Sequence, residues 1–191
     1  MHLIPKVFIP KVGSTSFIAI DGRGGSGKST LAKMLSKKLH AEIIHVDDFM
    51  GWNTLDSWLP SLIQDVFMPV LGGAEVLSYN RSSWGEDHYP EPIHNQFVTK
   101  TMILEGVGAL RRELREYISL SIFVETPKEV CFERGVMRDV QAGKTVEEVS
   151  LLWNTWQKGE DEYFKKDTPK EYADVLIDGT QGFLQQFSFA L

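Results

Sequence analysis

The feature that most constrains the fold of this chain is the stretch GRGGSGKS at residues 22–29. It fits the pattern G-x-x-x-x-G-K-[ST], which is typical of loops that bind phosphate groups. The apolar run at residues 17–21 predicts a buried strand directly before it, and the apolar spacing over residues 30–39 predicts a helix after it. Since such a loop requires a strand on one side and a helix on the other, the context favours phosphate binding over a chance glycine-rich turn.

The residue types in this stretch suit an anionic ligand. Glycines let successive backbone N–H groups turn toward phosphate oxygens, and the helix N-terminus adds partial positive charge. We expect Lys28 to contact the β- and γ-phosphates of a nucleotide and Ser29 to ligate Mg²⁺. The residues expected to bind the nucleotide are Gly22, Gly24, Gly25, Ser26, Gly27, Lys28, Ser29 and Thr30.

Composition limits the remaining possibilities. A chain of 191 residues is long enough for one α/β domain with a substantial core, and we expect residues 1–191 to form a single domain. The net charge of −6 argues against a nucleic-acid polymer as partner, and the lack of a long apolar run argues against a membrane. With Cys131 as the only cysteine and no signal peptide at the N-terminus, the sequence predicts a cytoplasmic protein. A homo-oligomer is compatible with the sequence, which does not specify an oligomeric state.

Strand and helix patterns alternate along the chain, which predicts a three-layer α/β/α fold around a mostly parallel, five-stranded sheet. The expected strands are residues 17–21, 42–46, 101–105, 120–124 and 174–177. The expected helices are residues 30–39, 57–71, 108–117, a stretch from Pro127 to a break near Gly143, and 145–166. A polar excursion at about 79–96 and a helical lid at about 131–150 complete the prediction. Ligands of such sheets bind beyond the carboxyl ends of the strands.

Three carboxylates follow predicted strands. Asp47 and Asp48 come after residues 42–46, and either could accept a proton from a substrate hydroxyl, position Mg²⁺ through water, or simply cap a turn. Beside a phosphate loop the catalytic interpretation is favoured for Asp47. Glu105 ends the next strand, where a carboxylate can coordinate Mg²⁺, although a structural salt bridge is the alternative.

Arg134 and Arg138 are spaced four residues apart in a predicted helix and therefore share one face. A pair of guanidinium groups on one face can hold a phosphate during its transfer, and Asp139 can orient one of them. The alternative is a solvated helix face. Candidate contacts to the phosphoryl acceptor are Asp48, Phe49, Tyr79 and Arg81, with Trp52, Trp84 and His88 as weaker ones. Each of the five tryptophans is otherwise interpreted as core, with pocket lining as the alternative.

From residue 17 to residue 179 the sequence resembles the uridine kinase-like branch of P-loop small-molecule kinases. This branch includes uridine kinases, nicotinamide riboside kinases, pantothenate kinases of the bacterial type and phosphoribulokinases. Four segments besides the phosphate loop carry the resemblance: Asp47-Asp48-Phe49, Ile103-Leu104-Glu105-Gly106, Arg134 to Asp139 with Gly143-Lys144-Thr145, and Tyr172 to Ile177. The resemblance implies Asp47 as base, Glu105 for Mg²⁺, and Arg134 and Arg138 in the lid.

The resemblance implies an enzyme that uses ATP and Mg²⁺ to phosphorylate a hydroxyl of a small molecule. A nucleoside is the leading acceptor class, although Tyr79-Asn80-Arg81 departs from the Tyr-Asp-[Phe/Tyr] segment and downstream His of uridine kinases. A vitamin precursor or sugar is the alternative acceptor, and a non-catalytic regulatory protein that binds a nucleotide is the alternative from another class. No Asn-Lys-x-Asp element is present, which argues against a GTPase.

Overall fold

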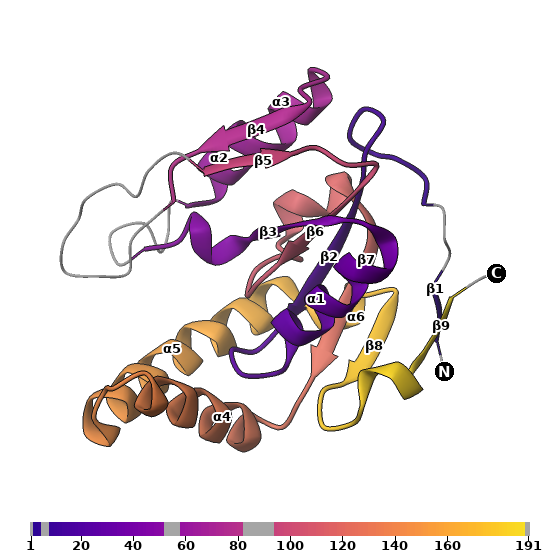
Figure 1. Ribbon diagram of the computed structural model, residues 1–191. Coiled ribbons are helices and arrows are strands. Elements are labelled where there is room, and N and C mark those ends of the chain that lie inside the picture. Colours follow the sequence, from indigo (N-terminus) through magenta and orange to yellow (C-terminus); the bar gives the residue numbers. More distant parts are fainter. Residues whose placement is uncertain (1, 5–7, 52–57, 82–93, 190–191) are drawn as a thin grey trace.

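The structure, a computed structural model, describes residues 2–4, 8–51, 58–81 and 94–189. A five-stranded parallel sheet lies at its centre, in the order β3-β6-β2-β7-β8 (Figure 1). The strands are β2 Ser16–Gly22, β3 Glu42–His45, β6 Thr101–Glu105, β7 Ile118–Glu125 and β8 Val175–Asp178. This arrangement confirms the predicted fold class, and each predicted strand is found within two residues of its expected bounds.

The central strand β2 shows why the chain folds into three layers. All of its residues are buried, and successive side chains point to opposite faces of the sheet. Phe17 and Ala19 join the core on one face, whereas Ile18 and Ile20 join the core on the other. A strand that is apolar on both sides must be covered on both sides, which is what helices on each face achieve.

Helices cover the two faces of the sheet. Helix α1, Lys28–Leu39, packs Leu31 and Leu35 onto one face. On the opposite face lie α2 (Trp58–Leu62), a π-helical stretch (Ile63–Phe67) and α3 (Met68–Leu71), which run on continuously. Together these segments take the place of the single helix expected at residues 57–71.

Two further helices lie side by side below the carboxyl ends of the strands (Figure 1). They are α4, Lys128–Gln141, and α5, Val146–Asp167, and the short α6, Pro169–Tyr172, follows them. The chain reverses direction at Gly143, whose φ of 100° suits glycine, so the predicted break is confirmed. Thr145 begins α5 with a capping box, because its side chain accepts from the N–H of Glu148 and the Glu148 carboxylate accepts in return from the N–H of Thr145.

Two pairs of strands outside the central sheet were not predicted. The ends of the expected polar excursion form an antiparallel hairpin of β4, Val76–Tyr79, and β5, His94–Phe97, and residues 82–93 between them lie outside the described residues. The short strands β1, His2–Ile4, and β9, Phe187–Phe189, pair in parallel.

The predicted helix at residues 108–117 is wrong over its first half. Residues 106–110 form an irregular turn, and a 3-10 helix spans only Arg112–Tyr117. The carboxylate of Asp21 accepts hydrogen bonds from the backbone N–H groups of Gly108 and Leu110. Since a tertiary partner takes these donors and Gly108 has a φ of 92°, an α-helix cannot begin here.

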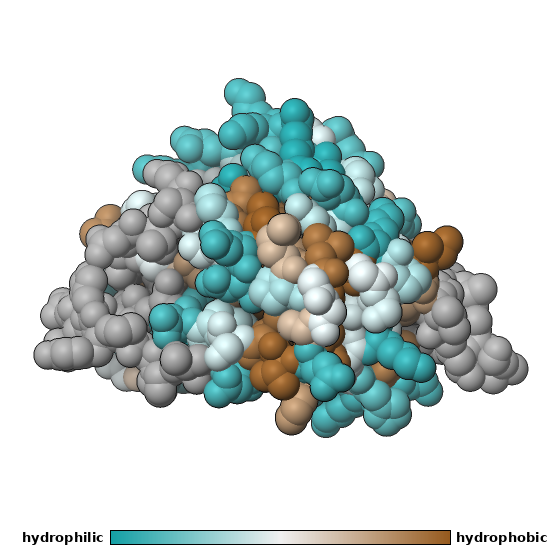
Figure 2. Space-filling view, turned by 90° about the horizontal axis from the view of Figure 1, so that it is seen from above, coloured by the Kyte–Doolittle hydropathy of each residue, from teal (hydrophilic) through white to brown (hydrophobic). Residues whose placement is uncertain are grey.

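Apolar side chains are exposed on α3 and on the adjoining hairpin, namely Met68, Leu71, Val76 and Phe97. Figure 2 looks onto this end of the molecule and shows apolar groups interrupting a largely hydrophilic surface. Among the helices that the structure describes, none combines the length and the apolar character needed to cross a bilayer.

Candidate functional site

The phosphate loop connects β2 to α1, as predicted, and Gly27 directly precedes the helix with a φ of 103°. Close packing explains the glycine at residue 25. Its φ is 80°, and a Cβ atom there would lie 2.3 Å from the carbonyl oxygen of Cys131 on α4. Any side chain at this position would therefore displace either the loop or helix α4.

A cavity of about 900 Å³ opens in front of the loop. Its walls come from the phosphate loop, the carboxyl ends of β3 and β6, helices α4 and α5, and the segment after β8. The predicted site residues that line it are Gly24, Gly25, Gly27, Lys28, Ser29, Thr30, Asp47, Glu105, Arg134 and Arg138. The structure therefore brings together residues that are far apart in the sequence, and its size suits a small organic ligand.

Gly22 and Ser26 belong to the loop but are absent from the described cavity lining. Ser26 is fully buried, and its carbonyl oxygen accepts a hydrogen bond from the Thr126 hydroxyl at 3.0 Å. Gly22 meets the backbone of β7, because a Cβ atom at residue 22 would lie 2.4 Å from the Val124 carbonyl oxygen. These two residues shape the loop, while the others predicted for the nucleotide face the cavity.

Lys28 is the first residue of α1 and is only 6% exposed. Its ammonium group donates a hydrogen bond to the carbonyl oxygen of Arg23, with 2.8 Å between Nζ and O. The loop therefore holds the charged end of Lys28 close to its own backbone. A cation in this position can bind a phosphate that enters the loop.

Ser29 and Glu105 meet at the edge of the cavity. The Ser29 hydroxyl donates to Oε1 of Glu105 at 3.1 Å, and Oε2 of Glu105 lies 2.8 Å from Nδ1 of His45. Burial acts to raise the pKa of Glu105, but the hydrogen bond from His45 and the positive charge of Lys28 outweigh it, so the pKa is lowered. Glu105 is therefore an anion beside a hydroxyl at neutral pH.

The two oxygens of Ser29 and Glu105 fit a Mg²⁺ ion that is completed by phosphate oxygens and water. Nowhere in the described ranges do three or more His, Cys, Asp and Glu side chains form a metal cage. The described residues therefore do not form a metal site from protein ligands alone. A carboxylate paired with the serine of a phosphate loop is the donor set expected where Mg²⁺ arrives with a nucleotide.

The neighbouring aspartates at the end of β3 point in different directions. Asp47 lines the cavity, where burial raises its pKa and the positive charge of Lys28 opposes that change. Asp48 turns toward the hairpin, where Oδ2 lies 3.3 Å from Nε of Arg81 and accepts a hydrogen bond from the Tyr79 hydroxyl at 3.4 Å. A carboxylate with a raised pKa that faces the cavity is suited to accept a proton there.

Arg134 and Arg138 both line the cavity from α4, but different partners hold them. Nη1 of Arg134 donates to the carbonyl oxygen of Gly179 at 3.0 Å, which ties the helix to the segment after β8. Nε of Arg138 lies 3.0 Å from Oδ1 of Asp139, and its guanidinium sits 5.5 Å from the ring of Trp153. Arg138 remains two-thirds exposed, with a side-chain exposure of 67%.

The residues proposed for the acceptor lie elsewhere. Among the described residues, the cavity lining omits Asp48, Phe49, Tyr79 and Arg81. Phe49 and Tyr79 are only 4% and 3% exposed, and their ring centroids lie 4.7 Å apart within the core. Arg81 lines a second, smaller cavity of about 300 Å³ next to His45 and His94. Trp52, Trp84 and His88 lie outside the described residues.

Several residues that line the cavity were not predicted as site residues. They include Lys144 between α4 and α5, Leu152, Trp153 and Trp156 on α5, and residues 179–183 after β8. The interpretation of Trp153 as core holds in part, because it is 6% exposed and packs against Gly135 while also facing the cavity. Lys144 and the strand that leads to Gly179 lie in segments that carry the family resemblance described above.

Comparisons with known proteins identify similar sequences and a similar fold. A family model described as "Phosphoribulokinase / Uridine kinase family" matches residues 80–182. A uridine kinase of Shewanella oneidensis is 27% identical over 182 residues, which cover 84% of this chain and 85% of that protein. A uridine kinase of Pasteurella multocida is 27% identical over 190 residues, covering 86% of each chain. The solved structure of a "possible uridine kinase" from Bacillus stearothermophilus has a similar fold, with a TM-score of 0.63 at 21% identity over 89% of this chain and 91% of that one.

Proposed function

The chain belongs to the phosphoribulokinase / uridine kinase family, and we propose that it transfers the γ-phosphoryl group of ATP to a hydroxyl group of a small molecule. The observation that carries the proposal is the meeting of Lys28, Ser29, Asp47 and Glu105 at one cavity. These residues provide a cation for the phosphates, two oxygens for a metal and a carboxylate for a proton.

Each side chain has a distinct task in this reaction. Bound Mg²⁺ would supply positive charge at the β- and γ-phosphate oxygens. Lys28 offsets charge on the same phosphates, and Ser29 with Glu105 would hold the metal. Asp47 accepts the proton of the acceptor hydroxyl, and the raised pKa of its carboxyl matches this role better than that of a fully exposed aspartate.

The lid completes the site. Arg134 and Arg138 project from α4 toward the cavity and offset the negative charge that develops on the transferring phosphoryl group. Closure of α4 and α5 over the ligands would exclude water and limit hydrolysis of ATP. A protein that used ATP only as a switch would need no carboxylate such as Asp47 beside the phosphates, so the enzyme is favoured over a regulatory binder.

A nucleoside remains the leading acceptor class, because the similar proteins named above are uridine kinases. Trp153 and Trp156 offer flat apolar surface to a planar ring on the α5 side of the cavity. Phe49 and Tyr79, which the sequence also suggests for that task, are buried and lie outside the described lining of this cavity. A vitamin precursor or a sugar is the alternative acceptor.

The experiment that tests the proposal is release of ADP from Mg·ATP in the presence of single acceptors. The panel contains nucleosides, vitamin precursors and sugars, with a no-acceptor reaction as background and Lys28→Ala as the inactive control. One acceptor that raises the rate well above background, in the wild type only, supports the proposal and identifies the substrate. Tight ATP binding with no acceptor-dependent release would instead favour the regulatory binder.

A further inference from the structure

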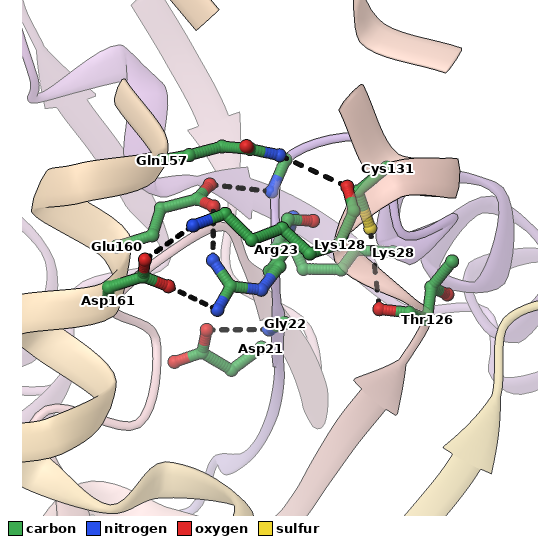
Figure 3. Close-up of polar contacts among 11 residues, drawn as sticks. Asp21, Gly22, Arg23, Lys28, Thr126, Lys128, Cys131, Gln157, Glu160 and Asp161 are labelled. Carbon is green, nitrogen blue, oxygen red and sulfur yellow. Dashed lines mark hydrogen bonds and ion pairs between the residues drawn. The ribbon is translucent and has the colours of Figure 1, made fainter. Parts of the chain in front are cut away.

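Glu160 on α5 is a buried carboxylate that the reaction described above does not use. It is only 2% exposed and lies behind the phosphate loop, outside the described lining of the cavity. Oε1 accepts a hydrogen bond from the backbone N–H of Gly24 at 2.7 Å, and Oε2 lies 3.3 Å from Nη1 of Arg23 (Figure 3). A buried carboxylate is costly unless it is paired and hydrogen-bonded, and here the phosphate loop provides both partners.

The peptide group between Arg23 and Gly24 is held on both of its sides. Its carbonyl oxygen accepts from Nζ of Lys28 at 2.8 Å, and its N–H donates to Glu160. One rigid peptide plane therefore links the carboxylate of Glu160 to the ammonium group of Lys28. If this plane turned over, its oxygen would face a carboxylate and its N–H would face an ammonium group, and both contacts would be repulsive.

Glycine at residue 24 makes such a rotation accessible unless another group prevents it. The site cannot carry a larger residue, because a Cβ atom there would lie 2.9 Å from the Trp153 ring and 3.2 Å from Oε1 of Glu160. The loop thus needs glycine for space, and groups outside residue 24 fix the peptide. The Ser26 N–H donates to its carbonyl oxygen at 3.0 Å, and Glu160 holds its N–H side.

Arg23 supports Glu160 and does not face the cavity. Its guanidinium turns toward α5, where it pairs with Glu160 and with Asp161 (Figure 3). It also lies 4.9 Å from the ring of Phe164. Asp161 also pairs with Lys128 of α4, at 2.5 Å between Oδ2 and Nζ. Burial raises the pKa of Glu160, whereas the Gly24 N–H, Lys28 and Arg23 act to lower it. The positive charge of Arg23 therefore favours the ionised form of this buried carboxylate.

We propose that Glu160 is a positioning residue for Lys28. It locks the Arg23–Gly24 peptide so that the Arg23 carbonyl holds the lysine ammonium group at the phosphate site. The inference rests on the proposed use of Lys28 for nucleotide phosphates. It also makes α5 a shared support, since the same helix lines the cavity with Trp153 and Trp156 and fixes the phosphate loop with Glu160.

The test compares Glu160→Leu and Glu160→Gln with a matched control, Asp161→Asn. Asp161 is the next residue on the same helix and pairs with the same arginine, but its carboxylate contacts the side chains of Arg23 and Lys128 rather than a loop amide. Affinity for Mg·ATP is measured by calorimetry well below the melting temperature of each variant. Exchange of the Gly24 amide hydrogen is measured by NMR without nucleotide.

We expect Glu160→Leu to weaken ATP binding by about tenfold or more, because it leaves a buried N–H without an acceptor. Glu160→Gln keeps an acceptor oxygen and should lose less than Glu160→Leu, and Asp161→Asn should stay within about twofold of the wild type. Exchange at Gly24 should be faster in Glu160→Leu than in Asp161→Asn.

Equal ATP affinity in folded Glu160→Leu and the wild type would overturn the inference, as would an equal loss in Asp161→Asn. If Glu160→Leu does not fold, Glu160→Gln decides: ATP affinity and Gly24 exchange both unchanged from the wild type would overturn the inference. A wild type that fails to bind ATP would refute the proposed function instead. Gly24 exchange would then still decide whether Glu160 fixes the loop.

Discussion

The hydroxyl of Ser29 donates a hydrogen bond to Glu105 across 76 positions of sequence, with 3.1 Å between Oγ and Oε1. The two residues meet because β2 and β6 are neighbouring parallel strands whose carboxyl ends lie at the same edge of the sheet. A serine chosen by the phosphate-loop pattern and a glutamate chosen by its place after a strand thus form one pair. The role in metal binding that we propose for them can be separated by experiment from that of Asp47.

Replacement of Glu105 by Gln should raise the Mg²⁺ concentration needed for half-maximal rate, because the amide is a weaker metal ligand than the carboxylate. Excess Mg²⁺ should restore much of the rate. The measurement is the rate of phosphoryl transfer against Mg²⁺ concentration at saturating ATP. A variant with an unchanged Mg²⁺ dependence would show that Glu105 does not serve the metal.

Asp47→Asn should lower the transfer rate by about 10²–10⁴-fold, the range expected for loss of a positioned base. Its Mg²⁺ dependence should change little, since metal cannot replace a proton acceptor. The same titration as for Glu105→Gln provides the comparison, with Asp48→Asn as the neighbouring control. Rescue of Asp47→Asn by Mg²⁺ would mean that the roles of the two carboxylates must be exchanged.

Lys28→Ala should abolish turnover and weaken ATP binding while the protein remains folded. The ammonium group contacts the loop backbone and faces the cavity, so its loss removes charge for the phosphates but little packing. Calorimetric titration with ATP and thermal melting check the two parts of this expectation. ATP affinity equal to that of the wild type in the folded variant would remove the basis for the proposed function.

Arg138→Ala and Arg134→Ala should each lower turnover by roughly 10³-fold or more, as expected for arginines that act on a transferring phosphoryl group. Arg134→Ala should also weaken ATP binding, because it releases the carbonyl of Gly179 at the cavity wall. Arg112→Ala is the control, since this exposed arginine pairs with Asp167 outside the described lining of the cavity. Near-normal rates in both lid variants would refute the lid assignment.

The contact between His45 and Glu105 predicts a pH dependence of stability. The hydrogen bond to Glu105 raises the pKa of His45 above its ordinary 6.5, and the pKa of Glu105 is lowered from 4.5. The contribution of His45 to the free energy of unfolding is complete below pH 6.5 and is lost as the pH rises through its raised pKa. The contribution of Glu105 is complete above pH 4.5 and is lost as the pH falls through its lowered pKa.

The free energy of unfolding lost in His45→Gln should therefore be largest between pH 4.5 and pH 6.5 and smaller on both sides. Denaturant unfolding of the metal-free and nucleotide-free protein at a series of pH values measures it. His40→Asn, at an exposed histidine after α1, is the control and should show no such maximum. A difference that grows steadily toward high pH would contradict the sign of these shifts.

The sheet could be predicted from the sequence because its strands are short apolar runs between turn residues, as residues 17–20 of β2 show. The hairpin could not, because β4 is only four residues long, its sequence Val-Leu-Ser-Tyr has no regular apolar and polar alternation, and its partner β5 lies beyond a polar segment. The first half of the predicted helix at 108–117 failed for a tertiary reason, since Asp21 takes two of its backbone donors. Local propensity contains no information about such a partner.

The candidate site also contains residues that could be predicted from the sequence and residues that could not. Motif residues such as Lys28, Ser29 and Glu105 were predictable because their chemistry is tied to fixed places in a pattern. The assignment of Phe49 and Tyr79 to the acceptor stays a prediction, because an aromatic ring that packs in the core and one that faces a ligand look alike in sequence. Glu160 gave no signal at all. A glutamate on a long charged helix normally lies in solvent, and its partner Gly24 is 136 positions away.

The central position of β2 has a consequence for how the protein is made. Its neighbours in the sheet are β6 and β7, which begin only at Thr101 and Ile118. A nascent chain that has emerged as far as residue 100 therefore carries the whole phosphate loop but neither strand that flanks it, and it exposes the apolar strand β2. Because these pairings are distant in sequence, they form late and slowly during folding. Since the Gly24 N–H of the phosphate loop donates to Glu160 on α5, the loop gains this contact only after α5 has left the ribosome.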